Sequence, residues 1–113
     1  MSGITTHVLD TSAGRPAAGM PVALHALSGS DWVQLASALT DADGRARNLT
    51  DAAAILNPGI YRLRFDVATY FKAKQIESFY PEVTVTFEVR DATQHYHVPL
   101  LLNPYGYTTY RGS

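Results

Sequence analysis

The sequence predicts an all-β protein, an antiparallel β-sandwich of seven to eight strands with one short helix. Apolar and polar residues alternate along most of the chain, glycine- and proline-rich turns separate the alternating stretches, and a single stretch breaks the period of two. The length of 113 residues fits one domain, residues 1–113. A small barrel is the alternative that these patterns leave open.

The two clearest strands lie in the second half of the chain. Residues 61–67 (YRLRFDV) alternate Tyr, Leu, Phe and Val with Arg, Arg and Asp, and residues 83–90 (VTVTFEVR) repeat the pattern. Successive side chains of a strand point to opposite faces of its sheet. Each stretch therefore has one face for the core and one for a polar environment.

Weaker alternation predicts six more strands, and these are residues 4–10, 21–27, 32–40, 45–49, 95–102 and 106–112. Residues 11–21 are a loop rich in Gly and Pro, and DADG at 41–44 is a tight hairpin turn in which Gly44 takes a positive φ. Asn57–Gly59 opens the strand at Tyr61, and residues 68–78 form about two to three helical turns before a strand that starts at Pro81.

The period of two also predicts which side chains share a face. Around Tyr96, the even-numbered residues of 95–102 form the core face, so His95 and His97 lie side by side on the other face, with Pro99 and Leu101. In residues 4–10, His7 likewise points away from the face of Ile4 and Val8. We expect a face of this composition to be buried against something, such as another subunit.

The same histidines have two simpler interpretations. A lone histidine is commonly a solvated or hydrogen-bonded side chain without a role, which is the default for His25 and His95. The spacing of His95 and His97 would suit zinc, but a third ligand would have to be His7 or a carboxylate. DADGR lacks the acidic positions of a calcium loop, so no metal is predicted.

Composition excludes several classes of protein. Nine basic and ten acidic residues argue against nucleic-acid binding, and the absence of cysteine excludes disulfides and thiolate chemistry. No apolar run reaches membrane length and no secretory leader is visible, so we expect a cytoplasmic protein with no membrane partner. No nucleophile elbow, phosphate-binding loop or dinucleotide fingerprint is present.

Several motifs in order carry a family resemblance. They are THVLDTSAGRPAAGMPVAL, TDADGR, GIYRLRFD, YFKAKQIESFYPEVTVTFEV and HYHVPLLLNPYGYTTYRGS, which together span nearly the whole chain. The chain resembles the transthyretin-like family, and within it the 5-hydroxyisourate hydrolases of purine catabolism. The closing YRGS is the tetrapeptide typical of the hydrolase branch. The resemblance implies the sandwich rather than the barrel.

The resemblance also implies site residues. The catalytic set is His7, Arg45, His97 and Ser113, and the substrate-binding set is Tyr110, Arg111, Gly112 and His95. Hormone-carrying transthyretins lack these polar residues, so their joint presence favours the hydrolase over a non-enzymatic carrier of small molecules. The family assembles as a homotetramer, in which outer sheet faces meet around a central channel that holds the sites.

The implied reaction is hydrolysis of 5-hydroxyisourate to 2-oxo-4-hydroxy-4-carboxy-5-ureidoimidazoline in urate degradation, by attack of water on a cyclic amide carbonyl, without a cofactor. Either His97 or His7 is the base, the other histidine serves the leaving nitrogen, and Arg45 binds the anionic substrate. Ser113 acts through its hydroxyl or its terminal carboxylate. Gly112 is expected to permit a final bend that brings Ser113 near the histidines.

Overall fold

The structure is a computed structural model that describes residues 3–47, 49–50 and 56–113. The described residues form nine strands and one helix, which are β1 (Gly3–Asp10), β2 (Arg15–Pro16), β3 (Pro21–Ser28), β4 (Asp31–Leu39), β5 (Arg45–Ala46), β6 (Gly59–Phe65), α1 (Val67–Ala73), β7 (Val83–Val89), β8 (His95–Asn103) and β9 (Gly106–Thr109).

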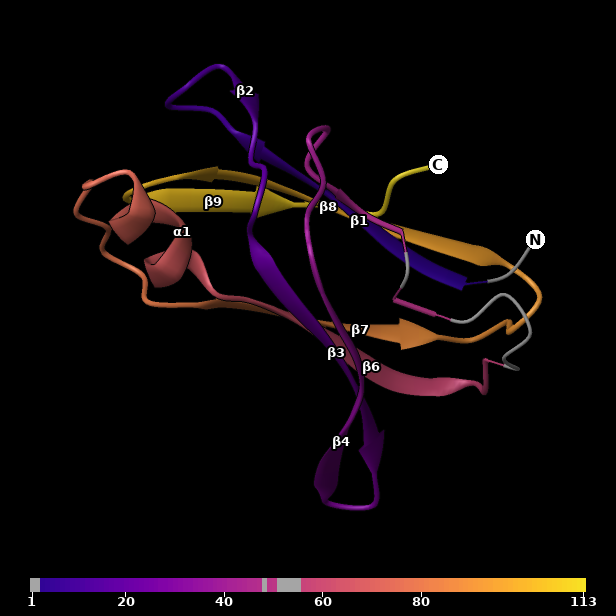
Figure 1. The fold of residues 1–113 in the computed structure, drawn as a ribbon. Coiled ribbons are helices and arrows are strands. Elements are labelled where there is room, and N and C mark those ends of the chain that lie inside the picture. The colour runs from indigo at the N-terminus through magenta and orange to yellow at the C-terminus, as the bar shows by residue number, and fades with distance from the viewer. Residues whose placement is uncertain (1–2, 48, 51–55) are drawn as a thin grey trace.

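The strands form two stacked sheets. In the first sheet the order is β2-β1-β8-β9, with β5 also paired to β1, and in the second sheet it is β4-β3-β6-β7. Figure 1 shows the two layers, with α1 at one end and the tip of the β3–β4 hairpin projecting beyond the layers. The predicted sandwich is confirmed, with seven longer strands and two of two residues each.

One pairing differs from the antiparallel prediction. β1 and β8 run parallel, with Gly3 opposite His95 and Asp10 opposite Leu102, whereas every other pairing of the described strands is antiparallel. The two strands are separated by the whole second sheet in the sequence, so no hairpin fixes their relative direction. This parallel pairing sets which residues of β1 lie beside the histidines of β8.

The predicted helix is confirmed but shorter. Asp66 caps α1 by accepting a hydrogen bond from the Thr69 amide at 3.2 Å. The chain leaves the helix soon after Ala73, because Gln75 takes a left-handed φ of 59°. The next strand begins at Val83, two residues later than predicted.

The turn at residues 41–44 is tight, and Gly44 has the predicted positive φ of 76°. The hairpin part of that prediction is wrong, because β4 belongs to the second sheet and β5 to the first. The turn therefore carries the chain across the sandwich. The strand predicted over residues 45–49 is observed only for Arg45–Ala46, and Asn48 lies outside the described residues.

Apolar side chains from both sheets fill the space between the layers. Ile4 and Val8 of β1 and Leu100 of β8 are fully buried against the second sheet, where Leu63 and Phe65 are equally buried. Burial of this apolar surface is the main term that stabilises the sandwich. No helix in the described part of the chain is long and apolar enough to cross a membrane.

Helix α1 is attached to the first sheet by a buried polar contact. The Tyr70 hydroxyl donates a 2.7 Å hydrogen bond to the carboxylate of Asp10, which also accepts from the hydroxyl and amide of Ser12. Burial opposes ionisation of Asp10, but these hydrogen bonds outweigh it and lower the pKa of the carboxyl below its ordinary value. Asp10 therefore has a structural role at the end of β1.

Candidate active site

The outer face of the first sheet carries the predicted histidines. Along β1, the inward side chains are buried and the outward ones, including Thr5 and His7, are half-buried. The parallel register places Thr5 opposite His97 and His7 opposite Pro99. The prediction that His7 and His97 leave the core on the same face is therefore confirmed.

Thr5 joins two of the histidines. Its hydroxyl lies 2.8 Å from Nδ1 of His97 and 2.9 Å from Nε2 of His95, both within hydrogen-bonding distance. The two rings thus share one polar atom, as the spacing of i and i+2 on a strand predicts. Nδ1 of His95 is buried and has no hydrogen-bond partner among the described residues.

His7 and Arg45 are brought together by the pairing of β1 with β5, which places them opposite each other. Nε2 of His7 donates a 2.8 Å hydrogen bond to the carbonyl oxygen of Asp43, because a carbonyl can only accept. The ring of His7 is therefore held by the turn that precedes Arg45. This contact could not be deduced from strand periodicity, since Asp43 lies in a turn.

The turn at residues 41–44 is held by the carboxylate of Asp41 and by the backbone conformation of Gly44. The carboxylate of Asp41 accepts from the amides of Asp43 at 2.9 Å and Arg45 at 3.0 Å. These contacts hold the pKa of Asp41 below its ordinary value, chiefly through the hydrogen bond from Arg45. Gly44 is required because a Cβ there would overlap the carbonyl oxygen of Val8, and because its φ is left-handed.

The end of the chain packs onto the histidine face. The Gly112 amide donates a 2.8 Å hydrogen bond to the His97 carbonyl oxygen. A Cβ on Gly112 would lie only 2.6 Å from Cδ2 of His97, and 3.4 Å from Cγ of Pro99. The predicted bend is not the reason for this glycine, because its φ lies outside the left-handed region. The close approach of the tail to His97 is the reason, and Ser113 follows directly.

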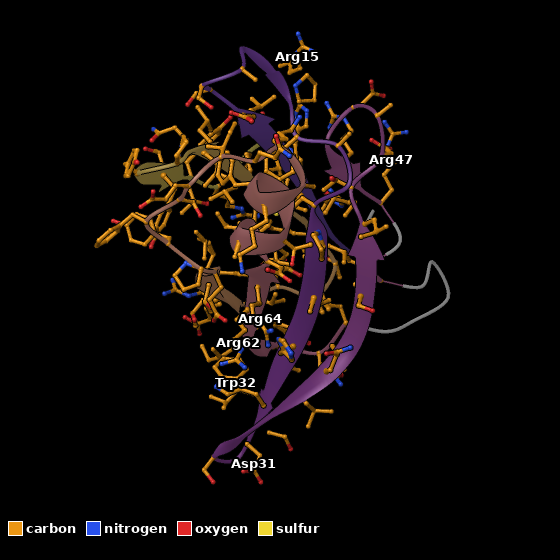
Figure 2. All side chains as sticks on the ribbon, turned by 60° about the vertical axis from the view of Figure 1, so that its left-hand side comes forward. Arg15, Asp31, Trp32, Arg47, Arg62 and Arg64 are labelled. Carbon is orange, nitrogen blue, oxygen red and sulfur yellow. The ribbon has the colours of Figure 1, made fainter. Side chains whose placement is uncertain are left out.

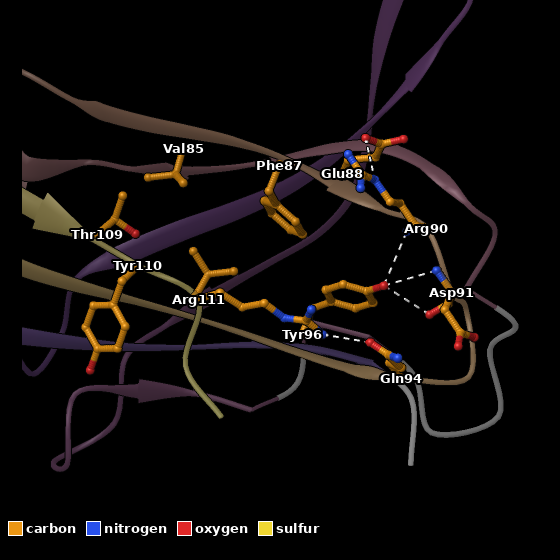
Figure 3. Close-up of a pocket in the computed structure, with 11 residues that line it drawn as sticks. Val85, Phe87, Glu88, Arg90, Asp91, Gln94, Tyr96, Thr109, Tyr110 and Arg111 are labelled. Carbon is orange, nitrogen blue, oxygen red and sulfur yellow. Dashed lines mark hydrogen bonds and ion pairs between the residues drawn. The ribbon is translucent and has the colours of Figure 1, made fainter.

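One residue of the predicted substrate-binding set, Arg111, lies elsewhere, whereas the register of β8 with the tail puts Tyr110 on the same outer face as Gly112. The guanidinium carbon of Arg111 lies 4.5 Å from the centre of the Tyr96 ring, and its Nη2 donates a 2.9 Å hydrogen bond to Gln94. Figure 3 shows Arg111 extended along Tyr96, with Tyr110 turned the other way. The structure therefore places the Arg111 side chain on the inner side of the sheet, away from His7 and His97.

Arg111 and Tyr96 help to line a pocket of about 480 Å³ between the edges of the two sheets. The lining residues are Val85, Phe87, Glu88, Arg90, Asp91, Gln94, Tyr96, Val98, Thr109, Tyr110 and Arg111. Both flanking strands, β7 and β9, are the edge strands of their sheets. Their outer backbone groups are thus available to pair with another strand.

The electrostatics of the histidine face favour a neutral His97. Burial lowers the pKa of His97, and the positive charge of Arg45 lowers it further, as do His7 and His95 when charged. An imidazole in this state can take part in proton transfer at neutral pH. Within the described residues, no group of three His, Cys, Asp or Glu side chains gathers closely enough to hold a metal ion.

Of the eight predicted site residues, the structure brings His7, Arg45, His95, His97, Tyr110 and Gly112 to one face, with exposed Ser113 next to Gly112. The sequence did not single out Thr5 as a site residue. Its position two residues before His7 on the same strand face was the available signal.

Comparison with known proteins identifies the family of the chain. The model of the HIUase/Transthyretin family matches residues 4–112. The chain belongs to this family. A curated 5-hydroxyisourate hydrolase from Caulobacter vibrioides is 47% identical over 117 residues, which cover all of both chains.

Two solved structures of the family show its two branches. A Klebsiella pneumoniae 5-hydroxyisourate hydrolase superposes with a TM-score of 0.82 at 36% identity, covering 97% of this chain and 98% of that one. Sea bream transthyretin in complex with thyroxine superposes with a TM-score of 0.90 at 29% identity, covering 96% and 93%. The fold is thus common to a hydrolase and a hormone-binding protein, so the side chains of the site must distinguish them.

Proposed function

We propose that this family member catalyses the hydrolysis of 5-hydroxyisourate to 2-oxo-4-hydroxy-4-carboxy-5-ureidoimidazoline in urate degradation. The observation that carries the proposal is the group of His7, Arg45 and His97 on one outer sheet face, with the chain end packed against His97. The relatives named 5-hydroxyisourate hydrolases, at 44–47% identity over nearly the whole chain, support the same activity.

The residues of this face meet the requirements of the reaction. Attack of water on a cyclic amide carbonyl needs a base for the water, a donor for the developing oxyanion and a proton for the leaving nitrogen. His7 and His97 are the candidates for proton transfer, and Arg45 offers a planar set of donors to an anionic, carbonyl-rich substrate. Among the described residues, no side chain forms an ion pair with the Arg45 guanidinium.

The chain end completes this face. Gly112 lies against the His97 ring. We therefore propose that Ser113, which follows Gly112 directly, orients water or an imidazole through its hydroxyl or its terminal carboxylate. Arg111 would then act by holding the tail, since it packs on Tyr96 on the opposite side of the sheet. Direct contact of Tyr110, Arg111 and His95 with substrate stays a prediction.

We propose further that the protein is a homotetramer. Among the described strands, β7 and β9 are edge strands that flank one pocket, and the half-buried Leu101 and His97 lie on the outer face of the first sheet. Pairing through the edges and contact between the outer faces would cover both surfaces and enclose the site in a channel. Cytoplasmic location, and the absence of nucleic-acid and membrane partners, stay predictions.

A non-enzymatic carrier is the alternative, because sea bream transthyretin has the same fold with thyroxine bound. A carrier of an aromatic hormone needs an apolar channel. Here the corresponding face would present two histidines and an arginine, and this polar character favours the hydrolase.

One experiment separates these functions. Freshly generated 5-hydroxyisourate is followed by its ultraviolet absorbance with and without the full-length protein. We expect decay well above the spontaneous rate, and unchanged decay would reject the hydrolase.

Light scattering after size exclusion tests the assembly, and a monomer at micromolar concentration would contradict the shared channel.

A further inference from the structure

The hydroxyl of Thr5 has a single proton but two histidine neighbours. It lies 2.9 Å from Nε2 of His95 and 2.8 Å from Nδ1 of His97. It can therefore donate to only one ring and must accept a proton from the other. The single hydroxyl proton therefore couples the tautomers of the two neutral histidines, and the tautomer of one ring determines that of the other.

The surroundings of His95 decide between the two arrangements. If Thr5 donated to Nε2 of His95, the proton of that ring would lie on Nδ1, which is buried without a partner among the described residues. A buried N–H without an acceptor is rare in proteins. In the other arrangement, Nε2 of His95 donates to Thr5, and Thr5 donates to Nδ1 of His97. The proton of neutral His97 then lies on Nε2.

The tautomer of His7 is fixed independently. Nε2 of His7 donates to the carbonyl of Asp43, so the neutral ring has its lone pair on Nδ1. The two candidate histidines therefore present opposite groups. His7 offers an acceptor at Nδ1, whereas His97 offers a donor at Nε2.

We propose that Thr5 and His95 are positioning residues that hold His97 as a hydrogen-bond donor and leave His7 as the general base. This inference rests on the proposed hydrolysis and assigns its two histidine roles. Nδ1 of His7 accepts a proton from water as the water oxygen bonds to the carbonyl carbon. Nε2–H of His97 stabilises the oxyanion, and the ring C–N bond breaks as the nitrogen receives the proton held by His7.

The tautomers can be measured without turnover. Long-range ¹H–¹⁵N correlation spectra of the labelled, full-length protein at neutral pH report which ring nitrogen carries each proton. We expect His97 and His7 both to be protonated at Nε2 and not at Nδ1. A proton on Nδ1 of His97 would overturn the inference, even if the protein hydrolyses 5-hydroxyisourate.

Two variants then test the effect on catalysis. Thr5→Val removes the hydroxyl but keeps the β-branched shape, and Thr5→Ser keeps the hydroxyl. If His97 must be held in one tautomer, Thr5→Val lowers kcat by at least about tenfold, with a smaller change in KM. Thr5→Ser should stay within about threefold of the unsubstituted protein, because the same donor and acceptor are retained.

The spectra of Thr5→Val provide the decisive control. We expect the Nε2–H form of His97 to lose its dominance while the melting temperature and assembly are kept. Unchanged kcat in a folded Thr5→Val protein would reject the positioning role. A lack of activity in the unsubstituted protein would instead reject the proposed hydrolysis, and the tautomer assignment would still be tested by the spectra.

Discussion

The outer face of each sheet carries a histidine opposite an arginine, but the two pairs make different contacts. In the second sheet, Arg62 lies opposite His25, donates to its Nδ1 at 3.4 Å, and places its guanidinium carbon 4.3 Å from the centre of the Trp32 ring. Figure 2 shows Arg62 and Trp32 adjacent in this sheet.

In the first sheet, the corresponding pair is His7 and Arg45, and the arginine makes no side-chain contact of this kind with the described residues. His25 is only 6% exposed and is hydrogen-bonded by its neighbours, whereas His7 and His97 are half-buried at the surface. Residue type therefore does not identify a site. The proposed site contains the pair whose polar groups the described fold leaves available to a ligand.

The largest expected difference between the two faces is in turnover. His97→Ala should lower kcat at least about a hundredfold, since loss of one hydrogen-bond donor to an oxyanion costs about 10²–10³ in rate. His25→Ala is the matched control. It should leave kcat of the folded protein near its original value. It should instead lower the free energy of unfolding by about 1–3 kcal/mol, because it removes a buried side chain and leaves the part-buried Arg62 without this partner. Near-normal turnover in His97→Ala would remove this residue from the mechanism.

The packing of the tail on the first sheet gives the next largest effect. Gly112→Ala would push a methyl group into the His97 ring, and displacement of a catalytic group by about 1 Å can cost a hundredfold, so we expect a loss of at least about tenfold in kcat. Gly106→Ala in β9 is the control, because its nearest contact would be an ordinary 3.7 Å to Asn103.

Deleting Arg111–Ser113, or adding a C-terminal tag, should likewise damage activity far more than the melting temperature. Full activity of the tagged protein would show that the tail is not part of the site.

The third difference concerns titration. Burial and neighbouring arginines lower the pKa of both His97 and His25 from the ordinary 6.5. Since a nearby cation disfavours imidazolium, Arg45→Gln should raise the pKa of His97 and leave that of His25 unchanged. Arg62→Gln should do the reverse. NMR titration measures the pKa of both rings. A change in the pKa of His25 in Arg45→Gln, or of His97 in Arg62→Gln, would contradict the assigned neighbours.

These pKa values also give the sign of the pH dependence. The unfolded chain binds protons at these two positions more readily than the folded protein does. Stability is therefore retained above pH 6.5 and falls as the pH decreases from 6.5 through the lower pKa values of the folded state.

The smallest effect is expected from the stacked arginine of the second sheet. Arg62→Gln removes the contact with Trp32, and such cation–π contacts contribute about 0.5–1 kcal/mol at exposed positions. Urea unfolding should show a loss of this size, while hydrolysis is unchanged. A marked loss of activity would mean that the second sheet also serves the site.

The sequence by itself determined the elements and the faces. A side-chain period of two placed His7 and His97 away from the core, and the Gly44 turn and the helix after Asp66 followed from local chemistry. The motifs in order were enough to predict the family. These properties depend on residues close together in the chain, so one sequence can show them.

Only the tertiary structure decided which neighbours the site residues have. The parallel pairing of β1 with β8 joins residues about ninety positions apart, and it alone places Thr5 between His95 and His97. Likewise, the tail pairs with β8 so that Gly112 contacts His97 while Arg111 turns to Tyr96. Strand order and register are set by packing across the whole sandwich, which local patterns do not encode.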